Sequence, residues 1–295
     1  MANLKEVRNR ITSVTSTMQI TSAMKMVSAA KLRRAQDAIV QMRPYANKLK
    51  DILSNLSSSV DASAEGGSFS VQREPSTVLI VMITSNRGLA GAFNTNVIKA
   101  TNQLIREKYS TQFKAGKVKF LSIGKKASDY ANRMKWPLLA NHNSLFEDLS
   151  FNNVAGVAKS IMDAFENKEV DRVELVYNAF RNAAVQIPTV EQFLPVLPAS
   201  QENTSKGKSI DYIFAPSKEE IVTELIPKSL KIQLFKAVLD SHAAEHGARM
   251  TAMNKATDNA KELIRDLKLS YNKARQAAIT NEILEIVGGA EALEG

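Results

Sequence analysis

The residues best suited to chemistry in this chain are two histidines, His242 and His246, which flank Glu245 on a predicted helix. Their spacing matches the H-x-x-E-H arrangement, in which two histidines one helical turn apart bind zinc. The pattern therefore raises a zinc hydrolase as one hypothesis. It lies in the middle of a long predicted helix with no obvious cleft, and His142 is the only other histidine. We therefore interpret the match as a coincidence.

Two glycine-containing segments resemble phosphate-binding loops. Gly207–Ser209 matches the end of a P-loop, but the required glycine five residues earlier is replaced by Glu202. Gly88 and Gly91 follow a predicted strand and open a helix, yet their spacing is not G-x-G-x-x-G, which favours a tight turn. The chain has no cysteine, which excludes disulfides, cysteine nucleophiles and cysteine-ligated metals. Because histidine is also scarce, we find no arrangement suited to serine or cysteine nucleophilic catalysis, and we expect no cofactor and no bound metal.

The charge of the chain is concentrated at its N-terminal end. The 295 residues carry 39 Lys and Arg against 30 Asp and Glu, and the first fifty hold ten of these cations with only Glu6 and Asp37. Such a basic segment binds nucleic acid or an acidic protein surface, or is simply a solvated face. Tyr45 is the only aromatic residue before position 60, so the stacking platform of a single-strand binder is missing.

The hydrophobic content places the chain among folded proteins without a membrane span. The sequence is 44% hydrophobic, which excludes a disordered protein. Its longest aliphatic run, Val78–Ile83, is far shorter than the roughly 20 residues that cross a bilayer. The first residues lack the apolar core of a signal peptide, so we expect a soluble, intracellular chain.

Residues 1–57 are predicted to form one long helix. Apolar or small residues recur at alternating spacings of three and four, which is typical of a coiled-coil seam: Leu4, Val7, Ile11, Val14, Met18, Thr21, Leu32, Ala35, Ile39, Met42, Ala46, Leu49, Leu53 and Leu56. The seam weakens at Lys25 and Ser28, where the apolar row moves to Ile20, Met24 and Val27. This shift predicts that the helix changes partner there, and Pro44 is predicted to kink or restart it.

The middle of the chain is predicted to be an α/β domain over residues 77–197. A Ser- and Gly-rich linker, 58–76, precedes it, and a second linker, 198–216, follows it with a possible edge strand at Tyr212–Phe214. Strands alternate with helices, which is typical of a Rossmann-like unit. The expected strands are 77–84, 118–123, 172–180 and 185–196, the last two as a hairpin, and the expected helices are 92–108, 125–134 and 152–165.

Residues 217–287 are predicted to form a second long helix, followed by a tail, 288–295. Ser217 and Glu220 make a capping box at its start, and Pro227 is predicted to kink it. Alanine is prominent on its predicted seam. The seam residues are Ile232, Phe235, Leu239, Met253, Ala256, Ala260, Leu263, Leu267, Ala274, Ala277 and Leu284. Neither helix can bury its seam alone, so we predict an antiparallel coiled coil of both termini with the α/β domain inserted. The C-terminal helix is longer by ~25 Å, and its end should project alone.

Three segments of the chain resemble the γ subunit of F-type ATP synthases, namely residues 20–32, 245–264 and 269–290. The last fits the family signature I-T-x-E-x-x-E-x-x-x-G-A through Ile279, Thr280, Glu282, Glu285, Gly289 and Ala290. Ser85–Asn94 is also similar to the family's S-D-R-G-L-C-G-x-x-N segment, with Asn86 and Ala90 in place of Asp and Cys. The resemblance covers the whole chain in the same order.

The resemblance implies a rotating central shaft of the bacterial type, which couples proton-driven rotation of the c-ring to ATP synthesis on the β subunits. It implies three α and three β subunits, the ε subunit and the c-ring as partners, and a non-catalytic role for this chain. Redox regulation of the chloroplast kind is excluded without cysteine, and the missing transit peptide favours a peripheral protein on the cytoplasmic face of a bacterial membrane. A coiled-coil scaffold or nucleic-acid-binding protein is the alternative.

The resemblance also implies contact sites with the α and β subunits. We expect them at Met24, Lys25, Arg33, Arg34, Arg275, Gln276 and Thr280. Met24 can equally be core packing of the coiled coil. The projecting end is apolar on nearly all sides, and such a helix requires burial all round, as in a bearing formed by other subunits.

Overall fold

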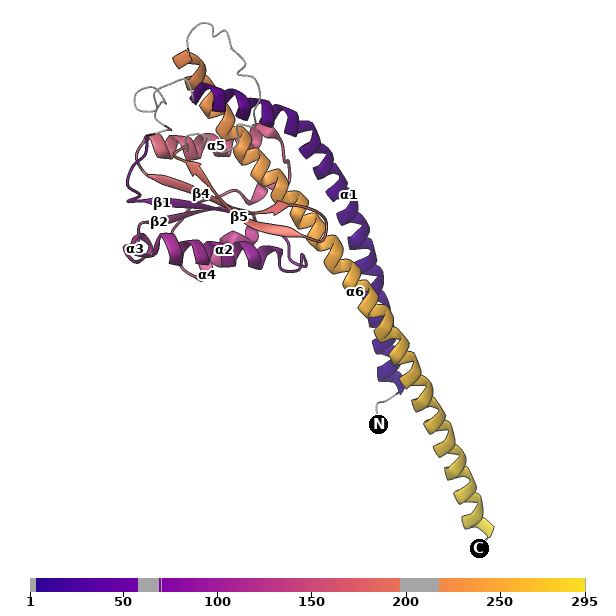
Figure 1. Cartoon of the computed structure of the whole chain (residues 1–295). Helices are drawn as coiled ribbons and strands as arrows, with labels where there is room; N and C mark the ends of the chain where they lie inside the picture. Colours follow the sequence, from indigo (N-terminus) through magenta and orange to yellow (C-terminus); the bar gives the residue numbers. More distant parts are fainter. Residues whose placement is uncertain (1–3, 58–68, 70, 197–217, 295) are drawn as a thin grey trace. The chain divides into compact units, whose positions relative to one another are not determined.

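A computed structural model describes residues 4–57, 69, 71–196 and 218–294. Two terminal helices, α1 (Leu4–Ser57) and α6 (Lys218–Glu294), flank an α/β region in the sequence (Figure 1). The chain divides into two compact units, Met1–Ala29 with Arg249–Gly295, and Ala30–Ala248. The predicted edge strand at Tyr212–Phe214, the capping residue Ser217 and most of both linkers lie outside the described residues.

The larger unit contains a five-stranded sheet in the order β3-β2-β1-β4-β5. Strands β1 (Val78–Ile83), β2 (Val118–Ile123), β3 (Leu138–Asn141) and β4 (Arg172–Phe180) are parallel, and β5 (Gln186–Leu194) returns antiparallel to β4. The structure confirms the four predicted strands and the hairpin. The structure also contains β3, which was not predicted. This strand is too short, and too polar at its end, to produce a recognisable strand pattern in the sequence.

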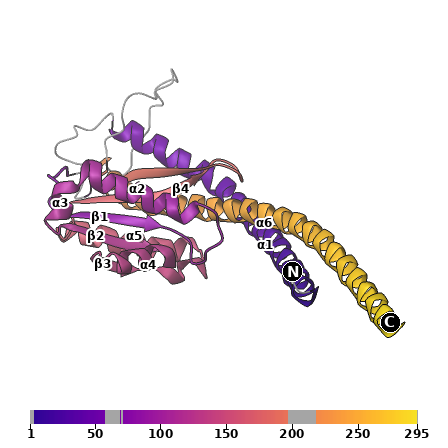
Figure 2. The same ribbon diagram turned by 90° about the horizontal axis from the view of Figure 1, so that it is seen from below.

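The sheet is covered by helices on both faces, because its central strands are apolar on both sides (Figures 1 and 2). Leu79, Val81 and Ile83 of β1 pack with α5 (Phe151–Glu166) and the first part of α6. The alternate residues of β1 pack with α2 (Phe93–Lys108) and α4 (Lys125–Arg133). The short helices α3 (Ser110–Lys114) and η2 (Asn143–Phe146) complete the connections. This arrangement confirms the Rossmann-like domain.

The smaller unit is an antiparallel pair formed by α1 and the C-terminal part of α6. The hydroxyl oxygens of Thr21 and Thr257 lie 2.8 Å apart across the pair. Counting in opposite directions from this contact places Leu4 opposite Ala274. The less exposed residues follow this register on both helices, at Leu4, Val7, Ile11, Val14, Met18 and Thr21 of α1, and at Thr257, Ala260, Ile264, Leu267, Tyr271 and Ala274 of α6.

Three details of the predicted helices are wrong. The seam of α1 does not move sideways, because Ile20 and Val27 are 61% and 57% exposed while Ser28 is buried. On α6 the predicted seam residues Leu263, Ala277 and Leu284 are exposed. The register of the pair turns Ile264 inward in place of Leu263, and Leu284 lies beyond the described part of α1. Of the two outcomes predicted for Pro44, the restart does not occur, because α1 is one helix from Leu4 to Ser57, and the kink stays a prediction. The proline is exposed, so the carbonyl that its missing N–H frees can bind water.

Candidate functional site

The histidine pair on α6 is packed within the larger unit. The Nε2 atoms of His242 and His246 lie 3.1 Å apart, and the ring of Phe146 stacks on His242 at 5.8 Å between centroids. A catalytic zinc site uses three protein ligands. Among the residues that the structure describes, no group of three His, Asp or Glu side chains is arranged to hold a metal ion. What the structure describes is a hydrogen-bonded pair of rings.

The segment Ser85–Asn94 folds as the tight turn that its glycines predict. Leu89 and Gly91 both have positive φ angles, 61° and 57°. The Asn94 side chain closes the turn, because its Oδ1 accepts a hydrogen bond from the Ser85 backbone N–H at 3.0 Å. The Asn86 side chain instead connects the turn to its surroundings, since it donates to Asn143 O at 2.7 Å and accepts from the Lys125 backbone N–H at 2.9 Å. The other glycine segment, Gly207–Ser209, lies outside the described residues.

The crevice in which doubly wound α/β domains bind ligands is filled here by α6. In such sheets the crevice lies beyond the carboxyl ends of the strands, where the strand order reverses, which is between β1 and β4 in this chain. Ala244 and Ala248 of α6 pack there against Ala90, Phe93 and Phe180. The β4–β5 hairpin also approaches closely, since a Cβ at Gly247 would lie 3.1 Å from Ala183 Cα. The domain therefore uses its crevice to hold a helix.

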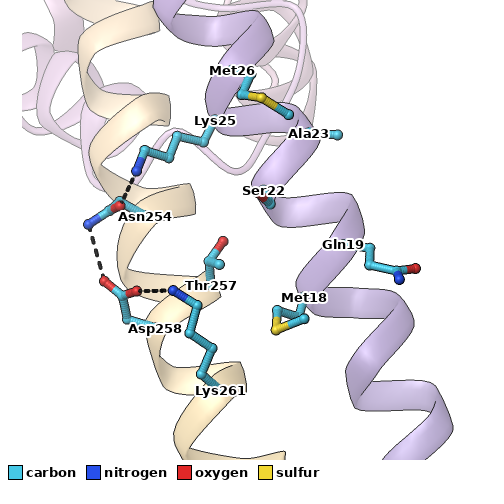
Figure 3. A pocket seen from close by; sticks show the side chains of 10 residues that line it. All are labelled: Met18, Gln19, Ser22, Ala23, Lys25, Met26, Asn254, Thr257, Asp258 and Lys261. Atoms are coloured by element: carbon cyan, nitrogen blue, oxygen red, sulfur yellow. Dashed lines mark hydrogen bonds and ion pairs between the residues drawn. The ribbon is translucent and has the colours of Figure 1, made fainter.

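The helix pair of the smaller unit carries a groove of about 340 Å³, lined by both apolar and polar side chains (Figure 3). Lys25 of α1 crosses it and donates to Asn254 Oδ1 of α6 at 2.6 Å. Asn254 donates in turn to Asp258 at 3.2 Å, and Lys261 pairs with the same carboxylate at 3.2 Å. The remaining lining residues are Met18, Gln19, Ser22, Ala23, Met26 and Thr257. This chain of polar contacts joins the two helices at the surface.

The Thr21–Thr257 contact is a buried polar layer beside this groove. Each hydroxyl also lies near a carbonyl of its own helix, Thr21 at 3.0 Å from Met18 O and Thr257 at 2.8 Å from Met253 O. Two hydroxyl protons cannot serve three such contacts at once. One threonine therefore donates to the other, and the acceptor donates to its own backbone.

The predicted partner-contact residues fall on three separate surfaces. Lys25 lies on the groove, and its neighbour Met24 is half-buried against the helix pair. Arg275, Gln276 and Thr280 are exposed near the end of α6, where the Thr280 hydroxyl donates to Gln276 O at 2.9 Å. The remaining two predicted contact residues, Arg33 and Arg34, are exposed on α1 in the larger unit.

Sequence reasoning missed the residues of α6 that face Lys25. Asn254, Asp258 and Lys261 are ordinary polar residues on a helix, and no motif marks them. The only signal is their spacing of four and three, which puts them on one helical face. Which residue of α1 they meet depends on the register of the pair, and this became visible only with the Thr21–Thr257 contact.

The last part of α6 presents an apolar surface that nothing in the described chain covers. Every residue from 281 to 290 is exposed. Ile283, Leu284, Ile286 and Val287 are each more than half exposed, up to 71% for Ile286. Counting along the pair explains this exposure, since the described part of α1 begins at Leu4, opposite Ala274. None of the described helices is both long and apolar enough to cross a membrane.

Comparison with known proteins gives the same result at several levels. A family model described as ATP synthase matches residues 3–293. Proteins named ATP synthase gamma chain from Flavobacterium johnsoniae and Flavobacterium psychrophilum are 60% and 62% identical, with all of both chains covered. The fold matches a chain of the Euglena gracilis mitochondrial ATP synthase in its OSCP/F1/c-ring structure, with a TM-score of 0.67, 23% identity and coverage of 98% of this chain and 94% of that one.

Proposed function

Because the chain belongs to the family of ATP synthase gamma chains, it is the non-catalytic central-stalk subunit of the rotor, and we propose how its two helices perform this role. In this family the chain turns with the c-ring and drives the β subunits through their nucleotide states. Its partners are the α and β subunits, three of each, the ε subunit and the c-ring. Catalysis of ATP synthesis takes place on the β subunits.

The observation that best supports this mechanism is the exposed end of α6. A single helix that is apolar on several sides is unstable in water unless other chains surround it. Ile283, Leu284 and Ile286 all require such burial. We propose that the ring of α and β subunits encloses this end as a bearing, in which contacts are apolar and do not lock one orientation.

We propose that the cations and the polar residues of the shaft contact the α and β subunits. The set is Met24, Lys25, Arg33, Arg34, Arg275, Gln276 and Thr280, which are half-buried or exposed. Exposed cations attract acidic loops over a distance and are screened by solvent, so they guide a partner without holding it tightly. This behaviour suits a surface that must pass three equivalent subunits in turn.

We propose that the α/β domain lies at the foot of the rotor, against the ε subunit and the c-ring. Its sheet is rigid because helices cover both faces, and α6 is part of that core. Torque applied to the domain therefore acts directly on the helix that extends into the shaft. The chain is part of a membrane-associated complex, and we place it on the cytoplasmic face of a bacterial membrane.

Purification of the tagged chain from its native membranes tests the role. We expect one copy of the chain with three α and three β subunits, and the complex should hydrolyse ATP. A preparation from cells with the tag on an unrelated protein is the control. Recovery of the chain alone, or with nucleic acid at low salt, would contradict the rotor role and favour the scaffold alternative.

A further inference from the structure

The Lys25 side chain is held by an uncharged acceptor, although a carboxylate lies nearby in the groove. Its Nζ donates to Asn254 Oδ1 at 2.6 Å across the helix pair (Figure 3). Asp258 is engaged by its own helix instead, through Asn254 Nδ2 and Lys261 Nζ, both at 3.2 Å. Among the described residues no carboxylate pairs with Lys25. The ammonium is therefore oriented while its charge stays available.

Asparagine is suited to this position because its amide accepts on one side and donates on the other. The carbonyl oxygen of Asn254 faces the cation, and the amide nitrogen faces the anion. An aspartate would neutralise Lys25 and repel Asp258, and a lysine would repel Lys25. Leucine would remove both contacts. Only a neutral amide satisfies both neighbours and leaves the Lys25 charge uncompensated.

Holding the lysine in advance favours binding, because less side-chain rotamer entropy is then lost when a partner fixes it. We propose that Asn254 is a positioning residue, which holds the Lys25 ammonium extended over the groove for a carboxylate of the subunit that surrounds the shaft. This inference rests on the proposed contact of Lys25 with that subunit. The inference adds Asn254 of α6 to the proposed contact residues, and Asn254 acts only through Lys25 of α1.

A double-mutant cycle tests the inference on the full-length chain. The variants are Lys25→Gln, Asn254→Leu and the two combined, and the measured quantity is the concentration of chain that half-restores ATP hydrolysis to purified α and β subunits. An exposed ion pair contributes about 0.2–1 kcal/mol, so we expect K25Q to raise this concentration by about 1.4- to five-fold. N254L should raise it by a smaller factor, and should have no further effect in the K25Q background.

Two further variants separate positioning from folding. Asn259→Leu, on the exposed side of the same helix, should leave the half-saturating concentration unchanged. Asn254→Asp keeps the acceptor but adds a charge, so its effect should equal that of K25Q and should disappear at high salt. The thermal midpoint of each isolated chain shows whether the helix pair remains folded.

The outcomes distinguish the two proposals. If K25Q changes nothing, the contact of Lys25 with the surrounding subunit is wrong. If K25Q weakens assembly but N254L weakens it by the same factor with and without Lys25, the contact stands and the positioning role of Asn254 is overturned. An effect of N254L that appears only with Lys25 present supports both.

Discussion

Among single residues, the glycines of the α/β domain differ in how closely other backbone approaches them. Gly124 begins α4 with φ at 105°, and a Cβ built on it would lie 2.1 Å from Thr84 O. Gly156 lies on the exposed side of α5 with nothing within 4 Å of such a Cβ. The same substitution should therefore have opposite effects at these two positions.

We expect Gly124→Ala to lower the free energy of unfolding by at least about 2 kcal/mol, because the clash and the left-handed backbone both oppose a side chain. Gly156→Ala should raise it by up to about 1 kcal/mol, since alanine favours the helix interior. Urea denaturation of the isolated chain measures both. Equal effects of the two substitutions would show that close packing at Gly124 is not decisive.

Asp240 on α6 is a half-buried carboxyl group near charged side chains of both signs. Burial raises its pKa, and Glu191 on β5 raises it further, whereas Lys236 on α6 and Arg43 on α1 lower it. A raised pKa means that the folded chain binds the proton more tightly than the unfolded chain. Stability is therefore highest below the unfolded value of 3.8 and falls as pH rises through the folded value.

We expect Asp240→Asn to remove this part of the pH dependence. At neutral pH the variant should be at least as stable as the wild type, because no buried charge has to be accommodated. As the pH falls through the raised pKa of Asp240, the difference should become smaller, since the wild-type carboxyl then takes up a proton. Thermal unfolding at several pH values measures this, and Asp258→Asn, on an exposed and ion-paired residue, serves as the comparison.

Among the elements, the helix pair is defined by which residues of α6 face α1. Ile264 lies on the observed seam and is half-buried, whereas its neighbour Leu263 is 40% exposed. The two side chains are the same size, and both are helix residues of the same turn. They therefore make a matched test of the register.

We expect Ile264→Ala to destabilise the helix pair by about 1–2 kcal/mol, part of the cost of the same change at a fully buried site. Leu263→Ala should change stability by less than about 0.5 kcal/mol, as exposed substitutions usually do. Hydrogen exchange of residues 4–21 reports the pair directly, and should become faster only in the first variant. The reverse order would mean that the seam lies at Leu263.

At the scale of the whole molecule, the last turns of α6 contribute to assembly and not to the stability of the isolated chain. Every residue from 281 to 290 is exposed, so none of them contributes a buried side chain. Removing residues 279–295 should therefore leave the thermal midpoint of the isolated chain unchanged. The truncated chain should fail to support ATP synthesis in membranes, because the bearing surface is lost. A normal synthesis rate would contradict the bearing role.

The patterns that repeat along the chain predicted most of the elements. Val78–Ile83 and Val118–Ile123 are aliphatic runs that only a buried strand explains, and both were predicted within one residue of their ends. β3 was missed because Leu138–Asn141 has four residues and half of them are exposed. A strand this short is defined by its pairing with a distant strand and not by its own sequence pattern.

The sequence predicted that the two terminal helices pair along an apolar seam, but it did not predict which residues of α6 form that seam. Alanines and hydroxyl residues occur on every face of α6, so Leu263 and Ala277 were as good candidates as Ile264 and Ala278. Ile20 and Val27 form an apolar row, and an apolar row predicts a buried seam. In the described chain both side chains are nevertheless exposed. Apolarity indicates burial somewhere, and the rotor role that we propose assigns this burial to other subunits.

The sequence by itself determined the two long helices, the inserted α/β domain and the family, because periodic patterns and long motifs are local properties. Tertiary structure decided three things that are not local: the Thr21–Thr257 register, the Lys25–Asn254 contact and the filling of the ligand crevice by Ala244 and Ala248. Each joins residues more than sixty positions apart. These contacts depend on how the helices pack, and no single segment of the sequence contains that information.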